Sequence, residues 1–175
     1  METWEAIRTR RNVRRFADRP IAPEHLDRIV AAAALAPSSM NEQRWAFVVC
    51  RSKERLQELA GVGDYAAHVA GAAAAIAFLT PRVDDAAERE SIAFDLGQAV
   101  ENAMLAAWDL GIGSCHASVY DEPAVRGLLG LPPALTCDLV VSFGYPMDPS
   151  SLLPPGTRGG RRSIAELRHD EAFGA

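Results

Sequence analysis

Residues 36–50 read APSSMNEQRWAFVVC, a stretch that contains the end of a helix, a polar loop and a whole strand. Before it, alanines and larger apolar residues recur at helical spacing until Pro37 ends the helix. The run from Trp45 to Cys50 is short and mostly apolar, which is typical of a strand covered on both faces. A strand that follows a helix in this way favours a sandwich in which helices cover a central sheet.

The same alternation of helices and strands continues on both sides of this stretch. Asp121 and Ser163 are suited to cap helices, and Gly111 and Gly130 stand where a glycine commonly ends one. The composition shows neither a repeat nor a linker, so we expect one domain over residues 1–175, of the α/β or α+β class. Helices are expected over 3–11, 23–36, 53–60, 84–110, between Asp121 and Gly130 and after Ser163, strands over 45–50, 72–79, 114–120 and 136–143, and a loop over 145–160.

Length, charge and cysteine content exclude several classes of protein. A chain of 175 residues can bury a core that needs no disulfide or metal. The net charge of −5 argues against a general nucleic-acid binder, because such proteins are usually basic. The longest apolar run, residues 69–79, is too short to cross a bilayer, and the N-terminus lacks the apolar segment of a secretory signal. We therefore expect a cytoplasmic protein that binds neither nucleic acid nor a membrane, with its three cysteines reduced and buried.

Arginines gather near both ends of this acidic chain. Residues 8–15 read RTRRNVRR, and residues 158–162 read RGGRR. A guanidinium group can bind two phosphate oxygens at once, and neighbouring guanidinium groups repel one another unless an anion or a carboxylate neutralises them. One interpretation is an anion site shared by the two groups. The other is a solvated basic face paired with acidic residues such as Glu5 and Asp18, and the arginines alone do not decide between the two.

Two further segments could face a ligand. In the polar loop, the amides of Asn41 and Gln43 suit the edge of a flat heterocycle, although such loops often bind only their own backbone. Residues 111–120 could lay backbone N–H groups along a ligand. Cys115 and His116 would point to opposite faces of a strand there, which argues against a nucleophile–base pair. The four histidines lack metal-ligand spacing, so we expect no metal site, and the sequence has no glycine-rich nucleotide-binding motif.

Four segments, taken in order along the chain, form a recognisable set. They are Arg10-Arg-Asn-Val-Arg-Arg-Phe16, Ala36-Pro-Ser-Ser-Met-Asn-Glu-Gln-Arg-Trp45, Gly111-Ile-Gly-Ser-Cys115 and Arg161-Arg-Ser-Ile-Ala-Glu166. Together they resemble the nitroreductase family of FMN-dependent oxidoreductases. The resemblance implies an α+β, nitroreductase-like fold with a central mixed β-sheet flanked by helices, in an intertwined homodimer with FMN at the subunit interface. It also implies ping-pong transfer of two electrons from NADH or NADPH to nitroaromatic compounds, quinones or similar small acceptors.

The resemblance assigns a cofactor-binding role to three groups of residues. The N-terminal group would hold the phosphate, ribityl chain and pyrimidine edge of FMN, with a C-terminal arginine closing on the phosphate. The loop group would come from the other subunit, and backbone groups of the third would face the flavin, one of them donating to N5. No side chain is expected to be catalytic, because the flavin carries the chemistry. The groups are Arg10, Arg11, Asn12 and Arg14 with Arg161 and Arg162; Pro37, Ser38, Ser39, Asn41 and Gln43; and His116, Ala117, Ser118 and Val119.

The chain departs from the family pattern in several places, and these departures bear on the substrate pocket more than on the cofactor. Asn12 replaces a serine, Arg44 replaces a proline, and the stretch 82–90 leaves little room for the helices that cover the flavin in larger members. Three alternatives therefore stay open. They are another redox chemistry on the same scaffold, such as dehalogenation or dehydrogenation, a flavin-binding or sensing module without turnover, and a protein without FMN whose arginines form structural pairs. The sequence does not choose between NADH and NADPH.

Overall fold

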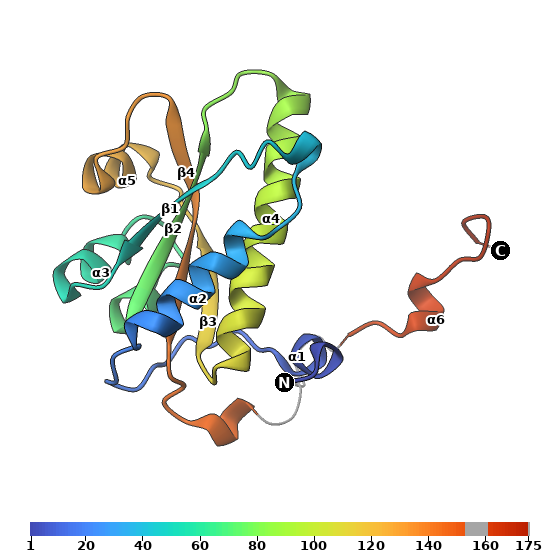
Figure 1. The fold of residues 1–175 in the computed structure, drawn as a ribbon, viewed down its shortest axis with the longest axis horizontal. Coiled ribbons are helices and arrows are strands. Elements are labelled where there is room, and N and C mark those ends of the chain that lie inside the picture. The colour runs from blue at the N-terminus through green and yellow to red at the C-terminus, as the bar shows by residue number, and fades with distance from the viewer. Residues whose placement is uncertain (153–160, 175) are drawn as a thin grey trace.

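The computed structural model describes residues 1–152 and 161–174. Its elements are α1 (Thr3–Thr9), α2 (Pro23–Ala34), β1 (Ala46–Cys50), α3 (Lys53–Leu59), β2 (Ala74–Pro81), α4 (Ala86–Asp109), β3 (Gly113–Ser118), α5 (Glu122–Leu129), β4 (Leu135–Gly144) and α6 (Ile164–Leu167), with short 3-10 helices at Ser39–Asn41, Ala67–Gly71 and Pro149–Leu152. The four strands form a central sheet, with α2 and α4 packed on one face and α3 and α5 on the other (Figure 1). The α+β class is confirmed.

Each expected helix and strand is present, with ends that differ by a few residues. Helix α1 ends at Thr9 instead of residue 11, and β1 begins one residue later than expected, at Ala46. The expected loop over 145–160 contains the 3-10 helix at Pro149–Leu152. The rest of that loop, residues 153–160, lies outside the described residues, and so does Arg158.

The sheet is antiparallel, whereas a mixed sheet was expected. Its strand order is β1-β2-β4-β3, and every neighbouring pair runs antiparallel. Helix α4 has 24 residues, about 36 Å at 1.5 Å per residue, and it returns the chain along the sheet so that β2 and β3 run in the same direction. These two strands are not neighbours, because β4 lies between them and pairs with both. In the described part of the chain, parallel pairing is limited to an isolated bridge between Asn12 and Ser114.

Strand β2 shows why an alanine-rich stretch forms a strand here. It lies inside the sheet and pairs with β1 on one edge and with β4 on the other. Ile76 and Phe78 pack among the residues of α2 and α4, whereas Ala75 and Ala77 pack among those of α3 and α5, and all four are buried. Pairing on both edges and burial on both faces therefore outweigh the preference of alanine for helix.

Helix α4 supplies much of the core on its side of the sheet. The Asp85 side chain caps it by accepting a hydrogen bond from the Glu88 N–H at 2.8 Å, and Gly111, with a φ of 73°, follows its end. Its inner face carries one buried acid, Asp95, which is 4 % exposed. Despite the length of α4, none of the helices in residues 1–152 and 161–174 is both long and apolar enough to cross a membrane.

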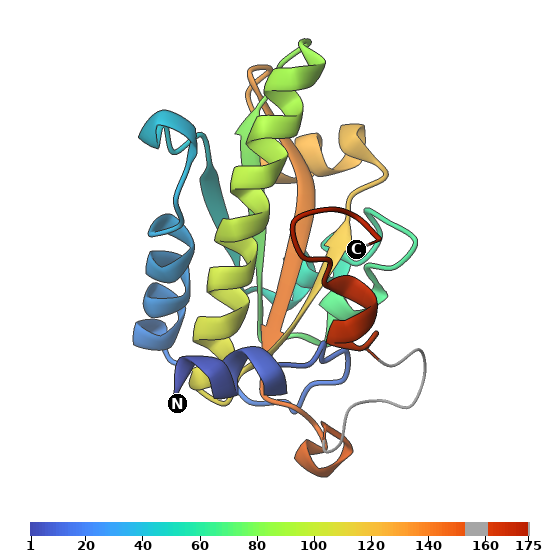
Figure 2. The same cartoon turned by 90° about the vertical axis from the view of Figure 1, so that its right-hand side faces the viewer.

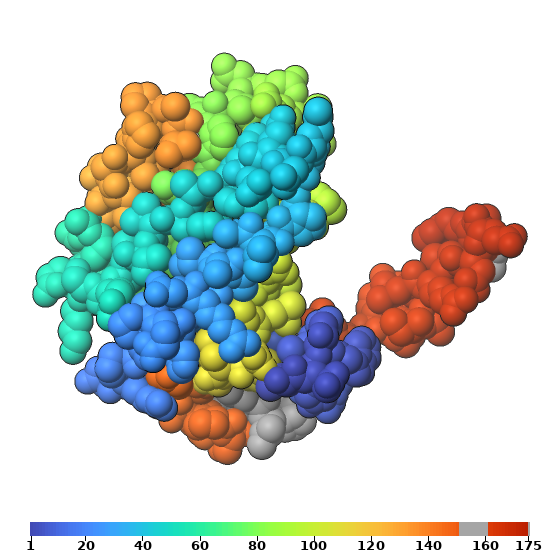
Figure 3. Space-filling model, in the orientation of Figure 1, coloured from blue at the N-terminus to red at the C-terminus, as the bar shows by residue number. Residues whose placement is uncertain are grey.

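The C-terminal arm, residues 161–174, projects away from the body of the molecule (Figure 1) and toward the viewer in Figure 2. Its short helix α6 begins with the expected capping box, in which the Glu166 carboxylate accepts a hydrogen bond from the Ser163 N–H at 2.7 Å. Every residue of the arm is exposed, including the apolar Ile164, Leu167 and Phe173. Figure 3 shows the arm as a separate projection, so its apolar side chains are not covered by their own chain.

Candidate functional site

Two cavities that share Arg14 lie beside β3, the edge strand of the sheet, and we call them together the arginine cleft. Their volumes are about 630 and 470 Å³, within the range of pockets that hold cofactors. The first is lined by Arg14, Tyr65, Ala67, His68, His116, Ala117 and Ser118, and the second by Asn12, Val13, Arg14, Arg15, Pro146, Met147 and Asp148. The structure therefore brings together Asn12 and Arg14 from the N-terminal segment and three of the four residues expected from β3.

The N-terminal segment reaches the cleft because it is fastened to β3. The Val13 N–H donates to the carbonyl of Ser114 at 2.9 Å. A β-carbon on Gly113 would lie 2.4 Å from a methyl group of Val13, so this close approach requires glycine. Val13 and Phe16 are buried, and the exposed Arg14 between them faces the cavity.

The arginines of this segment differ in their partners. Arg8 donates to Glu5 at 2.7 Å and Arg10 donates to Glu101 at 2.9 Å, so pairing with carboxylates accounts for these two. For Arg14, by contrast, the described residues supply neither a hydrogen bond nor an ion pair to the guanidinium group. A guanidinium group that lines a cavity and has no such partner among the described residues is suited to bind an anionic or polar ligand.

Arg11 and Asn12 lie between these positions and contact mainly their neighbours. Arg11 donates to the carbonyl oxygens of Arg8 and Arg10 at 3.1 and 2.8 Å, while its Nε atom is buried and has no partner among the described residues. The side-chain oxygen of Asn12 accepts from Arg10 at 3.1 Å. The buried Nε atom is a donor that a bound anion could satisfy.

Strand β3 turns alternate side chains to opposite faces. His116 and Ser118 are exposed, whereas Cys115 and Ala117 are buried, so Cys115 and His116 do not form a nucleophile–base pair. Burial raises the pKa of the Cys115 thiol, although Arg14 and Arg10 partly oppose the shift. The thiol is therefore protonated at neutral pH and is a poor nucleophile. All three cysteines are free and buried, as expected. Val119, just beyond the strand, donates its N–H to the carbonyl of Asp138 at 3.0 Å and does not line the cleft.

His68 and Tyr65 also line the cleft, although the sequence did not single them out. The Nδ1 atom of His68 lies 2.8 Å from the hydroxyl oxygen of Ser142, and its Nε2 atom is buried with no partner among the described residues. Burial lowers the pKa of His68, and the charge of Arg14 lowers it further. Ser142 is 74 residues away in the chain, and no local sequence pattern predicts a contact over that separation.

The polar loop does not line the arginine cleft. Its candidate residues are Pro37, Ser38, Ser39, Asn41 and Gln43. The buried Asp95 of α4 accepts a hydrogen bond from the Ser39 N–H at 3.0 Å. Within the loop, the Ser38 hydroxyl accepts from the Gln43 N–H at 2.9 Å. None of the five residues lines either cavity of the arginine cleft. One chain therefore does not bring this loop and the N-terminal arginines to the same ligand.

Arg161 and Arg162 likewise lie apart from the cleft within one chain. Both belong to the exposed C-terminal arm, and Arg162 donates to the carbonyl of Glu166 in the same arm at 2.9 Å. Neither lines the cleft. Among the described residues, Arg161 and Arg162 thus do not line the same cavity as the N-terminal arginines in a single copy of the chain.

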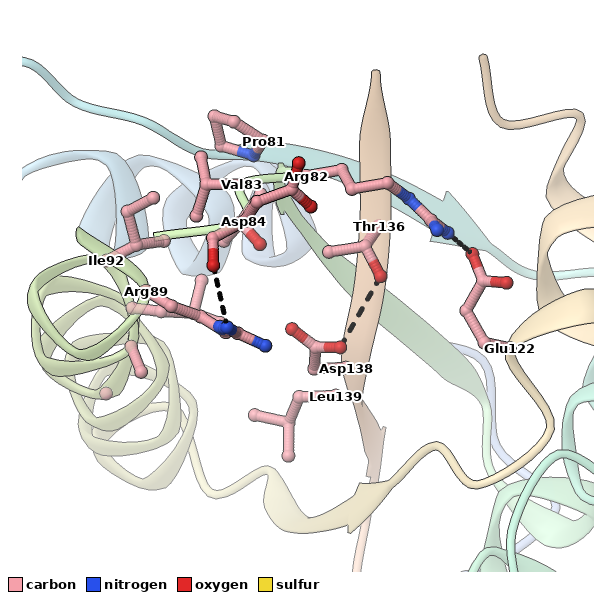
Figure 4. A pocket seen from close by; sticks show the side chains of 14 residues that line it. Pro81, Arg82, Val83, Asp84, Arg89, Ile92, Glu122, Thr136, Asp138 and Leu139 are labelled. Carbon is pink, nitrogen blue, oxygen red and sulfur yellow. Dashed lines mark hydrogen bonds and ion pairs between the residues drawn. The ribbon is translucent and has the colours of Figure 1, made fainter. Parts of the chain in front are cut away.

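A further cavity, of about 600 Å³, lies between the first half of α4, the end of β2 and the start of β4 (Figure 4). Its two arginines have partners nearby, because Arg82 pairs with Glu122 at 2.6 Å and Arg89 donates to the carbonyl of Asp84 at 3.1 Å. None of the residues expected to bind a cofactor lines it. The arginine cleft is therefore the better candidate site.

Comparison with known proteins supports one family. The profile of the nitroreductase family matches residues 7–71 and 60–145. A protein of Archaeoglobus fulgidus, provisionally named NADH dehydrogenase/NAD(P)H nitroreductase, is 38% identical over 151 residues, which are 84% of this chain and 87% of that protein. The FMN reductase (NAD(P)H) of Bacillus subtilis is 38% identical over 63 residues, which are 34% of this chain and 25% of that protein.

Solved structures agree with the sequence matches. A provisionally named nitroreductase of Desulfovibrio desulfuricans, solved in complex with FMN, has a TM-score of 0.80 and 28% identity, and the match covers 99% of each chain. The family profile covers most of this chain, and the archaeal relative is similar over most of its length. The resemblance of the four sequence segments is thus confirmed, and the chain belongs to the nitroreductase family.

Proposed function

We propose that the whole chain acts as one FMN-binding domain and transfers two electrons from NADH or NADPH to nitroaromatic compounds, quinones or similar acceptors. Membership of the nitroreductase family supports an FMN-dependent NAD(P)H oxidoreductase, as do relatives named for NAD(P)H nitroreductase and FMN reductase and a similar structure that contains FMN. The arginine cleft carries the proposal, because a guanidinium group without a partner in the described chain and an edge strand meet there at a cavity of cofactor size.

The residues of the N-terminal segment suit the phosphate end of FMN. Arg10, which also pairs with Glu101, and Arg11 would supply positive charge there, and the Nε atom of Arg11 is a buried donor still without a partner in the described structure. Asn12 adds an amide that can bind the ribityl hydroxyl groups. Arg161 or Arg162 of a second copy would add a guanidinium group from the C-terminal arm.

The residues of the cleft itself suit the flavin ring. When bound, FMN supplies the redox chemistry by accepting hydride from the nicotinamide and passing two electrons on. Arg14 stabilises the negative charge that reduction adds near the pyrimidine edge. Because β3 is an edge strand, its backbone over His116–Ser118 can donate an N–H to N5 and orient that atom, whereas the Val119 N–H is already bonded to Asp138. No side-chain base or nucleophile is needed, which agrees with a protonated Cys115.

A homodimer would complete this site. None of the loop residues lines the arginine cleft of its own chain, so in this proposal the loop reaches the ligand from a second copy. Apolar side chains suited to such an interface are exposed on the body and on the arm. They include Trp4 and Phe94, both 72 % exposed, and Phe173, which is 93 % exposed.

The absorption spectrum of the purified protein tests the proposal directly. Protein loaded with FMN should show the bands of oxidised flavin, bleach on anaerobic addition of NADH or NADPH, and regain colour with a quinone or nitroarene. Initial rates at several concentrations of both substrates should give the parallel lines of a ping-pong cycle. Colourless protein that takes up no FMN would contradict the proposal, and bound flavin that NAD(P)H cannot reduce would favour a sensing module.

A further inference from the structure

His68 lines the arginine cleft, and its side chain contacts strand β4. Its Nδ1 atom is 2.8 Å from the hydroxyl oxygen of Ser142, a fully buried residue of that strand. The same hydroxyl group donates to the backbone carbonyl of Cys115, at 3.2 Å. The three groups form a short chain of hydrogen bonds that leads from the edge strand into the cavity.

This chain of hydrogen bonds favours one tautomer of His68. A serine hydroxyl group has one proton to donate, and the Cys115 carbonyl is an acceptor within reach of the Ser142 hydroxyl. When Ser142 donates to that carbonyl, its oxygen accepts a hydrogen bond from Nδ1–H of His68. In neutral His68 the Nε2 atom then carries a lone pair and no proton. That atom is buried without a partner in the described structure, and His68 lines the cavity, so a ligand there can donate to it.

The groups around His68 keep it neutral in the absence of a ligand. Arg14 faces it from the N-terminal segment, His116 faces it from β3, and Tyr65 lines the same cavity. Burial, Arg14 and His116 all lower the pKa of His68, and the backbone of His116 opposes them only in part. None of the described residues that line this cavity is acidic, and Asp148 lines the adjoining cavity of the cleft. A ligand that gains negative charge inside this cavity would attract a proton to Nε2.

We propose that His68 is the proton-binding residue of the cleft: its Nε2 atom accepts a hydrogen bond from oxidised FMN and takes up a proton when the flavin is reduced. This inference rests on the proposed FMN function. Hydride transfer from NAD(P)H moves two electrons and one proton, and it leaves the flavin with one additional negative charge. His68 binds one proton from solvent in response, and it releases that proton when the two electrons pass to the acceptor.

The first test uses the protein without FMN and measures no activity. Nitrogen-15 NMR of the histidine rings should show neutral His68 at pH 7.5 with its proton on Nδ1. The signal is assigned by its absence in His68→Asn. In Ser142→Ala, the preference for this tautomer should be lost because the acceptor is gone. A proton found on Nε2 in the wild-type protein would overturn the inference.

The second test measures the reduction potential of bound FMN between pH 5.5 and 8.5. Uptake of one extra proton on reduction changes the equilibrium constant by a further factor of ten for each pH unit. For a two-electron couple this lowers the reduction potential by about 30 mV more per pH unit. The potential should therefore fall more steeply with pH in the wild type than in His68→Asn, by up to that amount. His25→Asn is the matched control, because His25 also has a buried nitrogen without a partner among the described residues but does not line the cleft.

The outcomes separate this inference from the proposed function. Equal slopes in the wild type and in His68→Asn, with FMN bound and reducible in both, would overturn the inference alone. A wild-type protein that shows no flavin spectrum would contradict the proposed function and, with it, this role of His68. If His68→Asn does not fold, His68→Gln replaces it, and the NMR measurement on the wild type still decides the tautomer.

Discussion

Arg8 and Arg14 belong to the same run of arginines but have different surroundings. Arg8 is exposed and paired with Glu5, and pairs of this kind contribute about 0.2–1 kcal/mol to stability. Arg14 faces a cavity and has no partner in the described part of the chain. A hydrogen bond from such a group to a charged ligand contributes about 1.5–3 kcal/mol to binding. The role of each arginine therefore follows from its surroundings and not from its place in the run.

Replacement of Arg14 by methionine tests this difference. We expect Arg14→Met to weaken FMN binding by about 10- to 100-fold, because the positive charge beside the flavin is lost. Arg8→Met is the matched control and should change the affinity less than about twofold. Quenching of flavin fluorescence on titration with the protein measures both. Unchanged affinity in Arg14→Met would remove Arg14 from the binding site.

Cys137 makes the stability of the protein depend on pH in the alkaline range. Burial in β4 raises the pKa of this thiol from 9.0 to about 12. The stabilising effect of burying the neutral thiol is complete below pH 9 and is lost as the pH rises toward 12, since only the unfolded chain then ionises. From pH 7 to pH 10 the loss is about 1.4 kcal/mol. Urea unfolding of Cys137→Ala should lack this part of the decline, and parallel declines in the variant and the wild type would contradict the assignment.

Among the connections between elements, the polar loop is held to α4 and to itself by specific hydrogen bonds. Met40, Asn41 and Gln43 have φ values of 50°, 58° and 50°, a region that costs a residue with a side chain about 1 kcal/mol. The hydrogen bond from Ser39 to Asp95 and the one from Gln43 to Ser38 offset this cost. Helix α4 therefore fixes the shape of the loop.

Substitution of Asp95 should release the loop. Asp95→Ala leaves the Ser39 N–H without its acceptor, and we expect a loss of about 1–3 kcal/mol in the free energy of unfolding. Asp95→Asn keeps a carbonyl oxygen at the same place and should restore most of it. Hydrogen exchange at the Ser39 amide should accelerate in the alanine variant and remain slow in the asparagine variant. Equal exchange in both variants and the wild type would show that Asp95 does not hold the loop.

The sequence predicts elements better than contacts, and particular residues show why. Caps at Asp121 and Ser163 and the helix-ending glycines Gly111 and Gly130 are local signals, so the helices could be placed. Strand order depends on which distant segments pair, and the insertion of β4 between β2 and β3 leaves no local sign. His68, in the 3-10 helix Ala67–Gly71, was missed for the same reason, because its partner Ser142 lies on β4, 74 residues away in the chain. The left-handed backbone conformation at Met40 could not be predicted either, because such a conformation is usually marked by glycine and methionine stands there instead.

In the whole molecule, the C-terminal arm stands out because its large apolar side chains are exposed in a single chain. Ile164 is 72 % and Leu167 is 54 % exposed, and both stand on the short helix α6. We expect the wild type to sediment as a dimer and the double variant Ile164→Asp/Leu167→Asp to sediment largely as a monomer with weaker FMN binding. Ala172→Asp is the matched control, since it adds negative charge to the same arm without removing a large apolar side chain. A stable, FMN-loaded wild-type monomer would contradict the shared site.

In the proposed dimer, the arm of one molecule is covered by the other, and the last step of maturation is then an encounter between two molecules. A monomer that has refolded from urea would bind FMN fully only after it meets a partner. Recovery of bound flavin should then follow second-order kinetics, with a half-time that halves when the protein concentration doubles, while the far-ultraviolet dichroism returns at a rate independent of concentration.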